Sequence, residues 1–154
     1  MLVFRLCRKP FSRSPLDGRG GLFASGRWHT PRRLVCYASE SLALASLEVL
    51  VHCAPDLFPS DLLAVEINLP ERVAVDELSR RSLPRSWRRY PAPAVIQRLG
   101  DAWLDQVSAC VLRVPSALIP SERNFLINPA HPDVRKLRVV RKTPFRFDPR
   151  LVPH

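Results

Sequence analysis

With 154 residues, the chain is long enough for one domain that buries about two-thirds of its unfolded surface. Apolar residues make up 46% of it and charged residues 25%, which is typical of a folded protein and argues against a disordered one. No apolar run approaches the roughly 20 residues of a membrane span, and the short apolar start before Arg5 argues against a secretion signal. We therefore expect a single domain over residues 1–154, located in the cytoplasm and without a membrane partner.

The formal net charge of +10 comes almost entirely from arginine, which supplies 21 of the 24 basic residues. Such a charge fits attraction to an anion, such as nucleic acid or a nucleotide phosphate. It also fits arginines that are simply dispersed over a solvated surface. The spacing favours dispersal, because the arginines are not grouped in one basic helix.

The four cysteines, Cys7, Cys36, Cys53 and Cys110, are widely spaced, and no C-x-x-C pair occurs. Three of them lie in apolar runs, which predicts reduced and buried thiols. The four histidines also lack the spacing of metal ligands. We therefore expect no metal site.

The first part of the chain predicts two strands joined by a long loop. Leu2–Leu6 is a short apolar run, and Leu34–Tyr37 is a second one. Between them, residues 8–26 hold two prolines and four glycines, which predicts a loop without regular structure. Loops of this length in compact domains are more often functional.

The segment Ser39–Cys53 predicts a helix, with Ser39 as its N-cap and Pro55 just beyond its end. Because the segment is apolar around most of its circumference, we expect the helix to be buried on most sides. After the first turn its only carboxylate is Glu48, and a buried carboxylate is costly unless it is paired or used. His52, four residues further on, is the modest candidate for such a partner.

The rest of the chain predicts one further long helix, Ala94–Gln106, among strands and loops. Its expected core face consists of Ile96, Leu99, Trp103 and Leu104. The other expected elements are strands at Leu62–Leu69, Val73–Val75, Ala109–Val114 and Asn124–Ile127, a short helix and loop within 76–93, and one or two basic strands over Leu137–Asp148 interrupted by Pro144. We interpret the pattern as an α+β fold with a mixed sheet and few flanking helices.

Familiar catalytic and binding motifs are missing from the sequence. It contains no phosphate-binding P-loop, no G-x-S-x-G nucleophile turn, no zinc finger and no convincing helix-turn-helix. The glycines at 18, 20 and 21 have neither a preceding strand nor a following helix, so they do not predict a dinucleotide-binding turn.

Several separated motifs nevertheless occur in an order that resembles the RES domain family. They are Gly26-Arg27-Trp28, the pattern V-x-Y-x-S-E-S-x-A-x-A-x-L-E-x-L-x-H over residues 35–52, Val114-Pro115-Ser116-Ala117, and N-x-L-x-N-P-x-H over residues 124–131. The resemblance runs from about Arg5 to about Val140. One departure is visible: the family commonly continues Gly-Arg-Trp with Asn and later Gly, whereas this chain has His29-Thr30-Pro31-Arg32.

The resemblance implies a fold like that of the ADP-ribosyltransferase toxins, with NAD+ as substrate and no further cofactor. Members of the family are toxins of bacterial toxin–antitoxin systems that cleave the nicotinamide–ribose bond, and some pass ADP-ribose to phosphate, water or a protein. The implied partner is an Xre-type DNA-binding antitoxin, with the toxin as a homodimer inside the complex. The implied active-site positions are Arg27, Tyr37, Glu48 and Ser116.

These residue types suit the implied chemistry. Loss of neutral nicotinamide leaves a positively charged ribose, which the carboxylate of Glu48 would stabilise. Arg27 offers a planar set of donors for the pyrophosphate, and Tyr37 offers a ring that stacks on nicotinamide. Ser116 follows a proline at a strand end, so its hydroxyl is expected to position substrate or acceptor. With Asn124, residues Arg27, Tyr37 and Ser116 form the expected NAD+-binding set.

Each of these residues taken alone also has a purely structural interpretation. A helical glutamate commonly pairs with a nearby base, a tyrosine at a strand end is commonly core, and a serine after proline is commonly a turn residue. Asn124, Asn128 and His131 would ordinarily fix loop backbone. Two other functions therefore remain open: a toxin that ADP-ribosylates one specific protein, and a non-catalytic basic module that binds nucleic acid.

Overall fold

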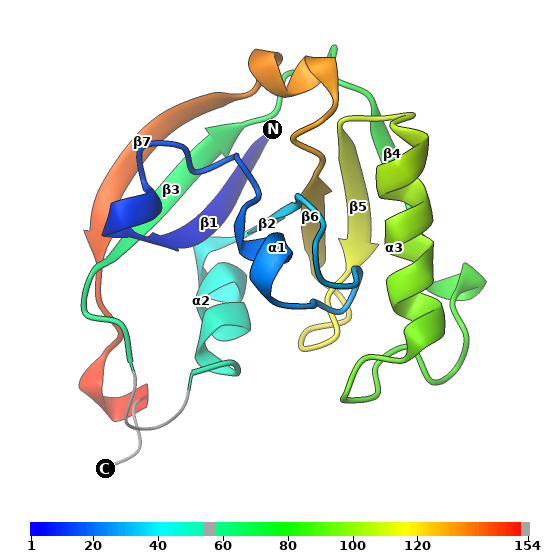
Figure 1. The fold of residues 1–154 in the computed structure, drawn as a ribbon. Helices are drawn as coiled ribbons and strands as arrows, with labels where there is room; N and C mark the ends of the chain where they lie inside the picture. The colour runs from blue at the N-terminus through cyan, green and yellow to red at the C-terminus, as the bar shows by residue number, and fades with distance from the viewer. Residues whose placement is uncertain (54–57, 152–154) are drawn as a thin grey trace.

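The structure is a computed structural model that describes residues 1–53 and 58–151, and its centre is one sheet of seven strands (Figure 1). In chain order the strands are β1 (Leu2–Arg8), β2 (Cys36–Ser39), β3 (Leu62–Asn68), β4 (Val75–Glu77), β5 (Val111–Pro115), β6 (Arg123–Ile127) and β7 (Arg138–Phe145). The α-helices of the described residues are α1 (Gly20–Phe23), α2 (Leu42–Leu50) and α3 (Ala94–Gln106). Short 3-10 helices lie at Lys9–Phe11, Arg80–Ser82, Pro132–Lys136 and Pro149–Leu151.

The strands lie in the order β4-β5-β6-β2-β1-β3-β7. β4 and β5 are parallel, and every other neighbouring pair is antiparallel. The sheet is therefore mixed and carries few helices, which confirms the expected α+β fold class.

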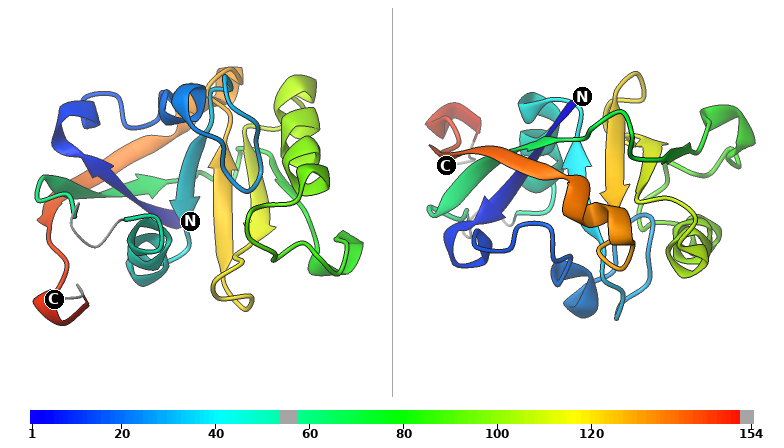
Figure 2. Two further views of the ribbon diagram at one scale, coloured as in Figure 1. Left: turned by 60° about the horizontal axis from the view of Figure 1, so that its bottom comes forward. Right: turned by 90° about the horizontal axis from the view of Figure 1, so that it is seen from above.

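The two faces of the sheet bury different sets of side chains. In β6, Phe125 and Ile127 join one core cluster, whereas Leu126 between them joins another. α3 packs on the Leu126 side through its own apolar residues. α2 packs on the same side. Ser39 lies opposite both Phe4 and Asn124 in the sheet, so these side chains share the face of Leu126. Leu6, two residues after Phe4, lies on that face too, and α2 packs against its cluster. β2 and β6 thus lie between the two helices (Figures 1 and 2).

α2 differs from the predicted helix at both ends and in its burial. Ser41, not Ser39, is the N-cap, and its Oγ accepts a hydrogen bond of 3.0 Å from the backbone N–H of Leu44. Ser39 is instead paired within the sheet. Of the helix, only Leu44 and Ala45 are fully buried. The prediction that it is buried on most sides is therefore wrong, because α2 rests on the sheet with one face.

α3 has the predicted bounds, but its buried face is not the predicted one. Ile96, Trp103 and Leu104 are buried as expected, whereas Leu99 is exposed. Gly100 and Asp101 take its place on the inner face. Hydrophobicity alone did not identify these two, because a glycine and a carboxylate are buried only where a specific neighbour requires them.

Several strands are displaced from their predicted bounds by one or two residues. β2 begins at Cys36 and not at Leu34, β4 begins at Val75, and β5 begins at Val111. The loop predicted over 8–26 contains the single turn of α1, so it is not without structure. β7 runs uninterrupted through Pro144, because it is an edge strand and a proline there removes no sheet hydrogen bond on its open side.

The described residues hold no group of histidine, cysteine or acidic side chains that could bind a metal ion. All four cysteines are free, and burial raises the pKa of the Cys110 thiol to about 11. Among the helices of residues 1–53 and 58–151, none is long and apolar enough to span a membrane.

The backbone of α3 passes unusually close to the segment that leads into β2. A Cβ added to Gly100 would lie 1.8 Å from the carbonyl oxygen of Trp28, whose side chain is fully buried in the core beneath α3. Alanine is the better helix former by about 1 kcal/mol, so the glycine is explained by this contact and not by helix propensity.

We predict that Gly100→Ala lowers the free energy of unfolding by about 1–3 kcal/mol, because α3 or the Trp28 backbone must move to make room. Urea unfolding measures this. Gly20→Ala is the matched control, since an added Cβ there meets nothing within 4 Å. A Gly100→Ala variant as stable as the wild type would show that the contact is not tight.

Candidate active site

A cavity of about 990 Å³ opens on the face of the sheet that carries α2 and α3. Its walls come from α2, from the segment between α1 and β2, from residues 88–92, and from β2 and β6. Arg27, Tyr37, Glu48 and Asn124 all line it. The structure therefore brings four of the residues singled out in the sequence into one cavity.

Glu48 points toward the sheet because it lies one turn beyond Leu44 and Ala45, the buried residues of α2. Its Oε1 accepts two hydrogen bonds, 2.9 Å from Ser116 Oγ and 2.6 Å from Asn124 Nδ2. Its Oε2 accepts none of the hydrogen bonds found in the described part of the chain. One carboxylate oxygen is thus held by the protein, and the other is available to a ligand.

The orientation of the Asn124 amide is set by the pairing of β2 with β6. Ser39 and Asn124 are cross-strand partners, and the Ser39 hydroxyl donates to Asn124 Oδ1 over 2.7 Å. With its oxygen engaged by a hydroxyl donor, the amide turns its NH₂ group toward Glu48. Ser39, which sequence analysis treated only as a helix cap, is therefore part of the site's support.

Ser116 is fully buried and does not line the cavity. Its Oγ accepts hydrogen bonds of 3.1 Å from the backbone N–H groups of Leu118 and Ile119 and donates its proton to Glu48. This placement favours a role in orienting Glu48 over direct contact with a ligand. The Glu48–His52 pair is not among the interactions of the described residues, because α2 ends at Leu50, before His52.

Arg27 also lines the cavity, and its Nη1 donates to the carbonyls of Trp87 (2.7 Å) and Arg89 (3.0 Å). Burial lowers the pKa of Arg27, and the charge of Glu48 partly opposes this shift. Arg88 also lines the cavity, and its Nε donates to the Ala117 carbonyl over 3.0 Å. Sequence analysis missed Arg88, because it is one of several arginines in a polar segment without a motif.

Tyr37 and His29 form a hydrogen-bonded pair in the wall of the cavity. The Tyr37 hydroxyl lies 2.8 Å from His29 Nδ1, and His29 Nε2 lies 3.0 Å from the carbonyl oxygen of Ala24. Burial raises the pKa of Tyr37 well above its usual value and lowers the pKa of His29 below 6.5. Both side chains are therefore neutral near pH 7.

The loop that departs from the family pattern is anchored to α3 through Asp101. This carboxylate accepts hydrogen bonds from Thr30 N (3.1 Å) and Thr30 Oγ1 (2.7 Å), and it forms an ion pair of 3.1 Å with Arg33. His29, Thr30 and the residues after them thus have defined partners. With this loop, Arg27 still lines the cavity.

Asn128 and His131 lie outside the cavity wall and serve the backbone, as their structural interpretation predicts. Asn128 donates to the Leu104 carbonyl and accepts from Ala130 N, and His131 Nδ1 accepts from Asp133 N over 3.1 Å. Of the asparagines singled out in the sequence, only Asn124 reaches the site.

The burial of His29 predicts a pH-dependent stability. Unfolded His29 takes its usual pKa of 6.5, and folded His29 has a lower one, so the unfolded chain binds more protons between the two values. The wild type therefore loses stability as the pH falls from about 7, by at most about 1.4 kcal/mol per pH unit for this proton. Urea unfolding at several pH values measures it. The His29→Asn variant should show a smaller slope, and equal slopes would contradict the prediction.

Comparison with known proteins agrees with the motifs and the fold. The model of the family described as RES domain matches residues 2–148. A protein of Photorhabdus laumondii named Toxin Res is 34% identical, over 99% of this chain and 97% of its own length. A protein of a Sphingobium species named Prs ADP-ribosylating toxin is 33% identical, over 94% of this chain and 91% of its own. Since the family model matches nearly the whole chain, the protein belongs to the RES domain family.

A solved structure shows the same fold at low sequence identity. In the crystal structure of the M. tuberculosis MbcT–MbcA toxin–antitoxin complex, one chain superposes with a TM-score of 0.76 at 16% identity. The superposition covers 94% of this chain and 83% of that one. The fold of this chain is therefore found in another protein of quite different sequence.

Proposed function

We propose that this chain is the toxin of a toxin–antitoxin pair and that it breaks the nicotinamide–ribose bond of NAD+. The observation that carries the proposal is the placement of the two carboxylate oxygens of Glu48. One of its oxygens is held by Ser116 and Asn124, and the other is open to a cavity that Arg27 and Arg88 also line. A carboxylate that shares a cavity with two guanidinium groups suits a dinucleotide whose ribose becomes positive while its pyrophosphate stays negative.

Glu48 would assist cleavage of the nicotinamide–ribose bond through its charge. Nicotinamide leaves as a neutral molecule with the electron pair of the C–N bond, and positive charge develops on the ribose. A carboxylate that is already oriented stabilises that charge without having to reorganise. An acceptor oxygen then bonds to the ribose carbon; if the acceptor is water, the products are ADP-ribose, nicotinamide and a proton.

Arg27 and Arg88 would bind the pyrophosphate, and Tyr37 would stack on the nicotinamide ring. Arg27 uses Nη1 on two backbone carbonyls, which leaves its other nitrogens for the phosphates. The pyrophosphate side of the cavity is thus built by an arginine that the segment 87–89 holds in place.

Transfer of ADP-ribose to a specific protein is the second candidate. It is supported by the name of the Sphingobium relative, and it shares the same first step. The two candidates differ only in the acceptor, which the mouth of the cavity would select.

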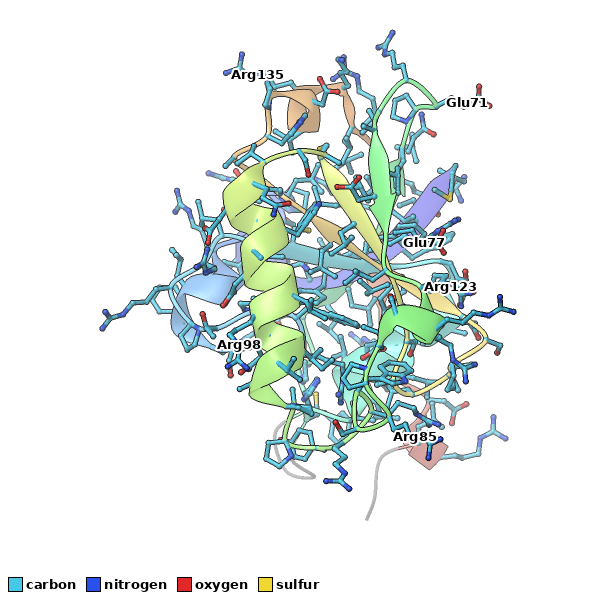
Figure 3. The ribbon with its side chains drawn as sticks, turned by 90° about the vertical axis from the view of Figure 1, so that its right-hand side faces the viewer. Glu71, Glu77, Arg85, Arg98, Arg123 and Arg135 are labelled. Atoms are coloured by element: carbon cyan, nitrogen blue, oxygen red, sulfur yellow. The ribbon has the colours of Figure 1, made fainter. Side chains whose placement is uncertain are left out.

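Nucleic-acid binding has less support. Arg85, Arg98, Arg123 and Arg135 are spread around α3 and not gathered into one patch (Figure 3). Glu71 and Glu77 lie among them on the same face (Figure 3). Interspersed charges of this kind do not form the continuous basic stripe that follows a nucleic-acid backbone.

An antitoxin is the proposed partner, and the Xre type and the toxin homodimer are part of the same proposal. Support for a partner comes from the structural neighbour, which was solved as a toxin–antitoxin complex. The likeness to ADP-ribosyltransferase toxins and the cytoplasmic location stay predictions of the sequence.

We predict that purified wild type releases nicotinamide from NAD+ and that Glu48→Gln lowers the rate at least about 100-fold, because the amide cannot balance the ribose charge. Nicotinamide release followed by chromatography measures both. Glu71→Gln, at an exposed glutamate that does not line the cavity, is the matched control and should keep full activity. A folded wild type that releases nothing would exclude the proposed function, and an active Glu48→Gln would exclude the proposed site.

The acceptor is tested with the same assay. If phosphate is the acceptor, its addition should speed nicotinamide release and give a phosphorylated ADP-ribose product. If a protein is the acceptor, cell extract with labelled NAD+ should give one labelled band and little free ADP-ribose. Release that is unaffected by either addition assigns water as the acceptor.

A further inference from the structure

The hydrogen bonds of His29 fix its tautomer. The Ala24 carbonyl oxygen 3.0 Å from Nε2 can only accept, so Nε2 carries the ring proton. In a neutral imidazole the other nitrogen, Nδ1, is then an acceptor. The Tyr37 hydroxyl, 2.8 Å from Nδ1, must therefore donate. The lowered pKa of His29 agrees with a neutral ring.

Both rings lie so close to glycine backbone that a larger residue at either glycine would meet one of them. A Cβ at Gly26 would lie 2.7 Å from His29 Nδ1 and 2.8 Å from the Tyr37 hydroxyl oxygen. A Cβ at Gly21 would lie 3.1 Å from His29 Nε2. Gly26 is itself held by α3, because Gln97 Nε2 donates to its carbonyl over 3.1 Å. The pair thus lies against α1 and the segment between α1 and β2, which α3 holds at Gly26.

Because both nitrogens of His29 are engaged within the protein, it has no free atom with which to exchange a proton with a ligand. Both residues line the cavity, and the Tyr37 hydroxyl is engaged by His29, which leaves the ring of Tyr37 as the part that can contact a ligand. The hydrogen bond between Tyr37 and His29 therefore orients the tyrosine ring and takes no part in the reaction itself.

We propose that His29 is a positioning residue, which in its Nε2–H tautomer holds the Tyr37 ring in the direction needed to stack on the leaving nicotinamide. The effect on activity rests on the proposed function, whereas the tautomer and the contact do not. A ring held in advance loses no conformational freedom when the substrate binds.

Substitution of His29 by asparagine or by glutamine tests its two hydrogen bonds separately. Asn can place its Oδ1 where Nδ1 lies and keep the bond to Tyr37, whereas Gln can place its amide where Nε2 lies and keep the bond to Ala24. We expect His29→Asn to stay within about threefold of the wild-type kcat/KM for NAD+, and His29→Gln to lose about tenfold. If His29 only filled space, the longer glutamine would replace it better, and His29→Gln would be the more active variant.

A double-mutant cycle then tests whether His29 acts through Tyr37. Tyr37→Phe removes the hydroxyl and leaves His29 intact, and it should lose about as much activity as His29→Gln. The variant carrying both changes should be no slower than Tyr37→Phe alone. Losses that multiply, or a fully active His29→Gln, would overturn the proposal.

Nitrogen NMR of the imidazoles provides the readout that does not depend on activity. The chain has four histidines, so the His29 signals are assigned by their loss in His29→Gln. We expect a protonated Nε2 and a bare Nδ1 whose resonance shifts in Tyr37→Phe. A protonated Nδ1, or no shift, would overturn the proposal even if NAD+ is cleaved. If the wild type releases no nicotinamide but the shift is seen, the proposed function fails and the contact stands.

Discussion

The buried amide of Asn124 is the constraint on which the site depends. Its oxygen accepts from Ser39, so its NH₂ group must face Glu48, and the short contact of 2.6 Å follows. The amide can do this only because β2 and β6 pair in one register, with Ser39 opposite Asn124. A slip of one residue would turn Asn124 to the other face of the sheet, and Glu48 would lose its strongest partner.

The two walls of the cavity are held by different parts of the fold. The carboxylate wall is built from α2 and the end of β6, with Ser116 buried behind it. The segment with Arg27 is held by α3, which bonds Gly26 through Gln97, and Tyr37 is held in β2. Glu48 and Arg27 thus line one cavity, where the charge of Glu48 acts on Arg27. A ligand with both charges would find a partner for each of them there.

Local pattern predicted the elements well where the pattern was distinctive. The bounds of α3 agree with the prediction, because an amphipathic run that follows Pro93 has few alternative interpretations. β2 and β5 were misplaced by two residues, because continuous apolar runs show no alternation that marks their ends. Ser39 has the chemistry of both a helix cap and a polar strand residue. Only the pairing with Asn124 decides between them, and that partner lies 85 residues away.

By itself, the sequence determined which residue types are present and in what order, and from that order the family and the α+β class followed. The tertiary structure alone decided which atoms meet: Ser116 behind Glu48, Arg88 beside the cavity, and His29 against Tyr37. The physical reason is distance along the chain. Glu48 is 68 residues from Ser116 and 76 from Asn124, and contacts of that range depend on strand register and helix packing, which no local pattern encodes.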